Sequence, residues 1–364
     1  MKFIHTADWQ IGMKAEALGD RAPQVREERL AAAQRVTEVA RTENADFILV
    51  AGDVFEDNAV DRRLVQKVAD TLRSFGAPIF IIPGNHDPLI PGSVWEHPSW
   101  NTPNITVIRE NTRIEVSQAV IYPCPLMEKR STSNPTAWIP NENNSRIRIG
   151  LAHGTVEGIR QDEPDYPIPR NTPEVKDLDY LALGHWHSYA SYTGADGNVR
   201  MAYSGTHETT KFGERDSGNV LIVEIDSAGK PPVIRRAKTG GLNWLSVSEE
   251  LIDQGDINKV KYLIDSMLNP SRTLIQLAIS GILPMEERSE LEHIEQMLDT
   301  RFLWSHIDCS QLRPAPTDRS WIEDLGPGVI QETARRLLGS SGSEPEVTQL
   351  ALARLYNIVK GSVK

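Results

Sequence analysis

The chain has 364 residues, of which 39% are hydrophobic, and a formal net charge of −11 at pH 7. This length allows more than one hydrophobic core, so we expect a large domain and at least one smaller domain. Because polyanions such as DNA are held largely through Lys and Arg, the acidic balance argues against a large independent DNA-binding surface, unless metal ions or a partner change the local charge.

Short apolar runs alternate with polar or helical segments over the first 240 residues. Runs of this kind predict strands that are buried on both faces of a layered α/β core. The strands are expected at residues 2–8, 46–53, 78–87, 147–154, 179–187 and 219–226. Residues 25–45 and 61–75 place apolar side chains at helical spacing, so we expect two amphipathic helices that cover a sheet.

The composition changes around "AKTGGLNW", which predicts a domain boundary near residue 240. Beyond this point we expect a small α/β unit. Its elements are predicted as a helix at 255–268, a strand at 273–280, a charged helix at 284–302 and a strand at 303–310. Residues 328–361 read as two amphipathic helices joined by a Ser/Gly loop. The predicted parts of the chain are therefore 1–240, 241–325 and 326–364.

Several apolar runs end in side chains that commonly bind metal ions. These side chains are Asp8, Asp53, Asn85 with His86, His153, and His185 with His187. In layered α/β sheets, ligands gather at the carboxyl ends of strands, so residues distant in sequence are expected to converge on one edge. A single histidine after an apolar run is more often structural. Five such endings in one chain favour a metal centre.

The ligand types suit two divalent ions. With Asp53 bridging both, the expected sets are Asp8, Gln10 and His187 for the first ion and Asn85, His153 and His185 for the second. Mixed oxygen and imidazole ligands fit manganese, iron, zinc or, less well, magnesium. Two such ions activate water and clamp the phosphoryl oxygens during in-line displacement. His86 is then left to stabilise the developing charge or to protonate the leaving oxygen.

In this order, "DWQ", "GDVFED", "GNHD", "AHG" and "GHWH" resemble the five motifs of the calcineurin-like metallophosphoesterases, which are D-x-H, G-D, G-N-H-D/E, H and G-H-x-H. The resemblance covers about the first 210 residues. "LDYLALGHWHS" followed by "YSGTHETTKFGERDSGNVLIVEID" is further similar to the SbcD group of DNA repair exonucleases. The resemblance implies a four-layer α/β/β/α sandwich over residues 1–240, a smaller α/β capping domain over 241–325 and C-terminal helices over 326–364.

The resemblance also implies an activity and partners. A member of this group is a metal-dependent DNA nuclease, an exonuclease that can also act as an endonuclease, and we expect manganese as its ion. In that group the capping domain helps to hold DNA over the metals. The C-terminal helices dock onto a coiled-coil, SMC-like ATPase of the SbcC type, and the nuclease is a homodimer within the complex. DNA, such an ATPase and a second copy are therefore the expected partners, in DNA repair or in defence against foreign DNA.

The sequence departs from the family pattern at two positions. Gln10 stands where the family usually has a metal-binding histidine, and a neutral amide oxygen is a weaker, harder ligand than imidazole. The first site should therefore be looser and favour manganese or magnesium. Glu56 stands where the repair nucleases commonly carry a histidine that supports His86. We expect the Glu56 carboxylate to orient His86 and to favour its protonated form; the alternative is an exposed loop acid.

Three further residues are weaker candidates for DNA contacts. Trp95 follows the "GNHD" motif, and an aromatic ring near a nuclease site can stack on a base, although such a ring more often anchors a loop. Lys211 and Arg215 are expected along the rim, where their charges would reach phosphates.

The sequence leaves two other functions open. A phosphodiesterase of small nucleotides would share the metal centre, but it needs neither a DNA cradle nor a docking helix. A non-catalytic DNA-end-binding subunit would have lost the first ion at Gln10. The apolar runs are too short to span a bilayer, the N-terminal segment becomes polar too early for a signal peptide, and Cys124 and Cys309 lack paired spacing, so we expect a cytoplasmic protein.

Overall fold

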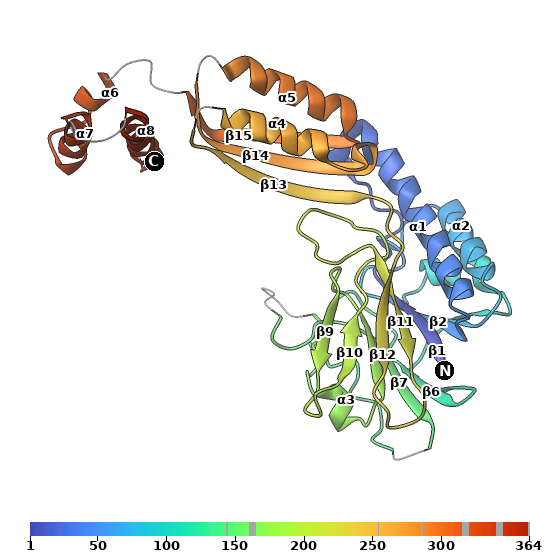
Figure 1. The fold of residues 1–364 in the computed structure, drawn as a ribbon. Helices are drawn as coiled ribbons and strands as arrows, with labels where there is room; N and C mark the ends of the chain where they lie inside the picture. Colours follow the sequence, from blue (N-terminus) through green and yellow to red (C-terminus); the bar gives the residue numbers. More distant parts are fainter. Residues whose placement is uncertain are drawn as a thin grey trace. The chain divides into compact units, whose positions relative to one another are not determined.

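The computed structural model describes residues 1–142, 145–159, 165–253, 255–284, 287–314, 320–339 and 345–362 (Figure 1). The chain forms two compact units, Met1–Leu242 and Asn243–Lys364. The further division that the sequence predicts at residue 325 stays a prediction.

The first sheet of the N-terminal unit carries three of the strands predicted to end in ligands. Its order is β12 (Val233–Lys238), β11 (Asn219–Glu224), β1 (Lys2–Thr6), β2 (Phe47–Ala51), β3 (Ile79–Ile82) and β4 (Ile105–Val107). β1, β2, β3 and β4 run parallel, whereas β11 is antiparallel to β1. The carboxyl ends of β1, β2 and β3 therefore meet at one edge.

The second sheet brings the remaining ligand strands together. Its order is β5 (Ile114–Val116), β6 (Ala119–Pro123), β7 (Ile147–His153), β8 (Tyr180–Gly184), β10 (Val199–Tyr203) and β9 (Ala190–Thr193). β6, β7, β8 and β10 run parallel. Every residue of β7 and β8 is buried, because these strands are covered on both faces.

Three apolar cores define the layers of this unit. The helices α1 (Ala22–Thr42) and α2 (Arg62–Arg73) lie side by side and pack on the first sheet through a core that includes Val36, Ile48 and Val68 (Figure 1). A second core, with Phe47 and Ile149 among its members, lies between the two sheets.

The outer face of the second sheet is covered by a third core. Loop residues such as Ile139 and Ile168 pack there, next to the single turn α3 (Thr172–Val175). The α/β layered fold that the sequence predicts is confirmed, and in the described part of the chain its fourth layer consists largely of loops. Three short 3-10 helices complete the unit: Glu16–Arg21, Val94–Glu96 and Pro98–Trp100.

The C-terminal unit contains a small parallel sheet. Its strands are β13 (Asn243–Leu251), β14 (Thr273–Leu283) and β15 (Trp304–Pro314), with a 3-10 turn at Pro270–Arg272. The helices α4 (Asp256–Ser266) and α5 (Arg288–Arg301) pack on one face of it (Figure 1). Ile257, Ile275 and Leu298 belong to the core between them.

Three helices end the described chain: α6 (Ser320–Glu323), α7 (Val329–Gly339) and α8 (Pro345–Ser362). They share a small cluster built on Trp321, Ile322 and Ala334. The Ser/Gly loop predicted between the last two helices lies outside the described residues. No helix among the described residues combines the length and apolarity that a membrane crossing requires.

His5 on β1 is expected to make the free energy of unfolding depend on pH. The ring is fully buried, with Nδ1 2.9 Å from the Tyr180 hydroxyl and Nε2 3.0 Å from the Leu183 carbonyl. Burial lowers its pKa to about 3, despite the hydrogen bond to Leu183. The unfolded chain therefore takes up this proton first, so the stability contributed by neutral His5 is present above pH ~6.5 and is lost as the pH falls toward 3.

We expect His5→Gln, which can still donate and accept at these two partners, to weaken that dependence. Between pH 6.5 and 5 the wild-type chain should lose about 2 kcal/mol more of its unfolding free energy than the variant. Urea unfolding at both pH values measures the difference. Equal losses in the two proteins would show that folding does not lower the pKa of His5.

Candidate metal centre

The side chains predicted as metal ligands follow strands from both sheets. Asp8 and Gln10 follow β1, Asp53 follows β2, and Asn85 follows β3. From the second sheet, His153 is the last residue of β7, and His185 and His187 follow β8. Residue pairs Ala7–Thr206 and Ile11–Phe55 form isolated bridges that continue the pairing past the strand ends.

Four of these residues adopt left-handed backbone conformations, with φ of 53° at Asp8, 46° at Gln10, 53° at Asp53 and 106° at His185. Such conformations cost a non-glycine residue about 1 kcal/mol or more, so the surroundings must hold them. The Asp8 N–H donates to the Gly52 carbonyl at 3.1 Å, and the Gln10 N–H donates to the Asp53 carbonyl at 3.0 Å. The turns after β1 and β2 therefore hold each other in place.

Asp53 is the hub of the site. Its Oδ1 accepts the main-chain N–H of His86 at 2.9 Å, and its Oδ2 accepts the Gln10 amide at 3.0 Å. The same Oδ2 lies 3.4 Å from His153 Nε2. One buried carboxylate thus touches groups from three separate segments, which is the position expected of a bridging ligand.

Asn85 joins the two histidines predicted to share its ion. Its Oδ1 lies 2.8 Å from His153 Nε2 and 3.1 Å from His185 Nδ1. The other ring nitrogen of His153 lies 2.8 Å from the Ala51 carbonyl, which fixes the orientation of the ring. Asp8 accepts the His185 N–H with both oxygens, at 2.9 and 3.1 Å. Close contacts therefore join six of the seven predicted ligands. The seventh, His187, lies near enough to interact electrostatically with Asp8 and Asp53.

The burial of these groups shifts their ionisation. Burial raises the pKa of Asp8 to about 6, although His153 and His187 oppose the shift. Burial also disfavours the charged forms of Asp53 and His153, but their mutual attraction outweighs it, so the pKa of Asp53 is lowered and that of His153 is raised to about 9. Burial and the nearby His153 lower the pKa of His185 to about 3.

The donor set fits divalent metal ions. Asp8, Asp53 and His153 each offer one ligand atom, and these atoms lie within 4.8 Å of one another. Buried carboxylates beside imidazoles are compensated well by a cation, and mixed oxygen and nitrogen ligands suit manganese, iron or zinc.

His86 is oriented by the main chain of Glu56. Its Nδ1 lies 2.9 Å from the Glu56 carbonyl oxygen, so Nδ1 carries the proton and Nε2 is directed to other partners. The sequence predicts this role for the Glu56 carboxylate, whereas the contact in the structure is made by the backbone. The Glu56 side chain is half-buried.

We therefore expect Glu56→Gln to leave the hydrolysis rate within about twofold of the wild type, since the carbonyl contact to His86 is retained. Replacing a half-buried side chain of this kind should change the activation free energy by only ~0.5 kcal/mol. The measurement is the rate as a function of pH, with His86→Ala as the control that loses activity. A shift in the pH profile of Glu56→Gln would instead show that the Glu56 carboxylate favours the protonated form of His86.

The structure also shows contributors that the sequence does not reveal. Glu214 places Oε1 3.0 Å from His187 Nδ1. Arg29, fully buried on α1, donates through Nε to the Trp9 carbonyl at 3.1 Å. Asp87 is buried and accepts the N–H groups of Phe55 and Gly84. No spacing marks Arg29 or Glu214, whereas Asp87 stands within the "GNHD" motif.

The three weaker candidates have different outcomes. Trp95 is fully buried, packs on Phe55 and Trp100, and donates its indole N–H to the Asp87 carbonyl. Because its ring has no face open to a base, Trp95 anchors the loop, and the prediction that it contacts DNA is wrong. Lys211 and Arg215 are exposed on either side of Glu214. The Arg215 N–H donates to Ser188 Oγ at 2.9 Å, which places this segment beside His187.

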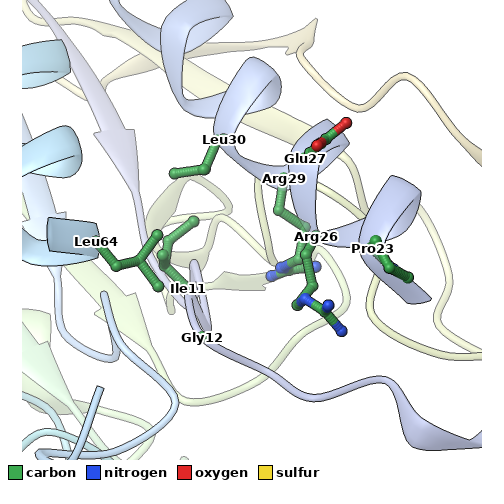
Figure 2. Close-up of a pocket in the computed structure, with 8 residues that line it drawn as sticks. All are labelled: Ile11, Gly12, Pro23, Arg26, Glu27, Arg29, Leu30 and Leu64. Atoms are coloured by element: carbon green, nitrogen blue, oxygen red, sulfur yellow. The ribbon is translucent and has the colours of Figure 1, made fainter. Parts of the chain in front are cut away.

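A cavity of about 220 Å³ lies between α1 and the segment after Gln10 (Figure 2). Ile11, Leu30 and Leu64 form its apolar wall, and Arg26 and Arg29 lie to one side. None of the seven predicted ligands lines this cavity. It is therefore separate from the metal centre.

Comparisons with known proteins show what this chain is similar to. Residues 1–189 match the family model of the calcineurin-like phosphoesterases. YhaO of Bacillus subtilis, described as an uncharacterized metallophosphoesterase, is 21% identical over 96% of this chain and 95% of its own length. The SbcD component of the nuclease SbcCD from Staphylococcus epidermidis is 24% identical over 62% of this chain and 67% of its own length. A dimetal phosphatase structure from Danio rerio is 10% identical, with a TM-score of 0.39 over 64% of this chain and 98% of that one.

Proposed function

Because the chain belongs to the calcineurin-like phosphoesterase family, we propose that it is a metal-dependent DNA nuclease. It acts as an exonuclease, with endonuclease activity as a second mode, and hydrolyses phosphodiester bonds. The observation that carries this proposal is the set of contacts that joins Asp8, Gln10, Asp53, Asn85, His153 and His185 with the His86 main chain.

The contacts support the following roles. Asp53 would hold both of two ions. Asp8, Gln10 and His187 would hold the first ion, and Asn85, His153 and His185 would hold the second. Bound divalent ions supply Lewis acidity toward the phosphoryl oxygens and activate water. His86, held by the Glu56 carbonyl, stabilises charge on the phosphoryl group and protonates the leaving oxygen.

Support for DNA as the substrate comes from three observations. The similarity to the SbcD component of the SbcCD nuclease extends over 62% of this chain. The chain also carries a second unit, Asn243–Lys364, which hydrolysis of a small ester does not require. Finally, the exposed Lys211 and Arg215 lie on the segment that contacts His187 through Glu214, where cations would meet the phosphates of a strand.

We assign the docking of a coiled-coil, SMC-like ATPase of the SbcC type to α7 and α8. Val329 on α7 is 81% exposed and Val347 on α8 is 55% exposed, and apolar residues open to water favour burial against a partner. A homodimer within that complex is part of the same proposal. Co-expression with a coiled-coil ATPase from the same genome, followed by size-exclusion chromatography, tests both points; a chain that elutes alone as a monomer contradicts them.

The first test of the function is manganese-dependent cleavage of end-labelled linear duplex and single-stranded DNA, with bis(4-nitrophenyl) phosphate as a small diester. The wild-type chain is compared with His86→Ala. DNA cleavage that disappears in the variant is the expected result. Turnover of the small ester alone favours a phosphodiesterase of small nucleotides. Inactivity on every substrate, with fewer than two bound ions, favours a DNA-end-binding subunit.

A further inference from the structure

The environment of His187 fixes which of its nitrogens is available for a metal ion. Nδ1 lies 3.0 Å from Glu214 Oε1 and 3.1 Å from Thr210 Oγ1. An ionised carboxylate only accepts hydrogen bonds, so Nδ1 carries the proton and the lone pair is on Nε2. This arrangement is the one by which carboxylates orient metal-binding histidines in proteins.

Glu214 is itself rigidly held. Its side chain is 3% exposed. Its Oε2 accepts the Thr210 N–H at 2.8 Å, and its Oε1 accepts the Thr210 hydroxyl. The adjacent Arg215 N–H is bound to Ser188, so the segment is fastened to the chain directly after His187. The carboxylate is therefore positioned before any ion binds.

Arg29 connects this segment to the turn that carries the other first-ion ligands. The guanidinium donates through Nε and Nη2 to the carbonyl of Trp9, which lies between Asp8 and Gln10. Nη1 donates to the carbonyls of Glu208 and Thr209, at 2.9 and 3.3 Å. Figure 2 shows Arg29 reaching from α1 alongside Ile11 and Gly12. One buried cation thus links the backbone at Trp9 with the backbone at Glu208 and Thr209.

We propose that Glu214 is a positioning residue for the first ion and that it compensates for Gln10. This inference rests on the proposed function, because it takes Asp8, Gln10 and His187 as the ligands of that ion. The amide of Gln10 is a weak ligand. A carboxylate behind His187 strengthens the imidazole as a donor, since it draws the Nδ1 proton and places negative charge behind the ring. Arg29 holds the segment that carries Asp8 and Gln10 in a fixed position relative to the segment that carries Glu214.

The test compares Mn²⁺ binding by wild type and Glu214→Gln, measured by isothermal titration calorimetry and by the electron paramagnetic resonance of free Mn²⁺. We expect two bound ions in the wild type and a loss of about 10–100-fold in affinity for one of them in the variant. Asp216→Asn is the matched control: Asp216 is exposed, pairs with Arg236, and has a φ of 53° that asparagine tolerates. It should bind both ions as the wild type does.

A second variant tests the compensation directly. Introducing Gln10→His into the Glu214→Gln background should restore the lost affinity, because imidazole replaces the weak amide. The ¹⁵N shifts of His187 in the metal-free protein should report a proton on Nδ1 in the wild type.

The outcomes separate the two proposals. Three results would overturn the role of Glu214: unchanged affinity for both ions in Glu214→Gln, equal weakening of both, or failure of Gln10→His to restore the lost affinity. If the wild type still cleaved DNA, the proposed function would stand. A wild-type chain that binds two ions but cleaves only small esters would overturn the DNA substrate and leave the positioning role in place. A wild-type chain without two ions would overturn both.

Discussion

Asp53→Asn is expected to lower phosphodiester hydrolysis by roughly 10³-fold, which corresponds to about 4 kcal/mol of transition-state stabilisation. The asparagine oxygen can still accept the His86 N–H, so the fold of the loop is retained. The variant lacks the negative charge that balances His153 and that the proposed function uses to bridge two ions. The measurement is the initial rate on bis(4-nitrophenyl) phosphate at saturating Mn²⁺.

The control for this variant is a neighbouring carboxylate outside the centre. Asp57 is exposed and caps its own turn through the Ala59 N–H. Asp57→Asn should retain the wild-type rate. If Asp53→Asn kept more than a tenth of the wild-type rate, Asp53 would not bridge the ions.

Arg29→Met is expected to lower the free energy of unfolding by about 3–5 kcal/mol, because the buried partners of the guanidinium lose their donor. Those partners include the carbonyls of Trp9, Glu208 and Thr209. Burial lowers the pKa of Arg29 to about 10, so the side chain is charged at neutral pH and its charge is matched by Glu208. Chemical denaturation followed by tryptophan fluorescence measures the loss.

Arg26→Met is the matched control for Arg29→Met. Arg26 lies on the same helix (Figure 2), is exposed, and donates to the Lys14 carbonyl. Its replacement should change the unfolding free energy by no more than about 0.5 kcal/mol. Similar losses in the two variants would mean that Arg29 acts through general helix stability and not through its buried contacts.

The sequence predicts most strands that are apolar on both faces, although it misses β6, every residue of which is buried. β2, β3, β7 and β8 are continuous runs of buried residues, and each lies within a predicted strand. The sequence pattern does not predict β12 and β13 as strands. Most of their residues are exposed or half-buried, because each strand lies at the edge of its sheet. Their charged and polar side chains resemble those of a loop or helix surface.

The residues of the candidate site also differ in how well the sequence predicts them. The proposed ligands can be recognised because they follow predicted strands and because their side chains are of types that commonly bind metal ions. The groups behind them are harder to identify. The sequence points to Glu56 as the partner of His86, but the contact is made by the carbonyl oxygen, which every residue possesses. Arg29 and Glu214 contact the site from segments that have no fixed spacing from it, so only the three-dimensional contacts identify these two residues.

The proposed ligand side chains come from segments that are far apart in the chain; Asp8 and His185, for example, are separated by 177 positions. An unfolded chain cannot hold them together, so divalent ions bind the native protein in preference to the unfolded one. Each ion at 100 times its dissociation constant then adds about 2.7 kcal/mol to the native state. Under the proposed function, bound metal would therefore slow proteolysis of the protein as well as support its activity. A cell short of metal would hold fewer copies of the protein.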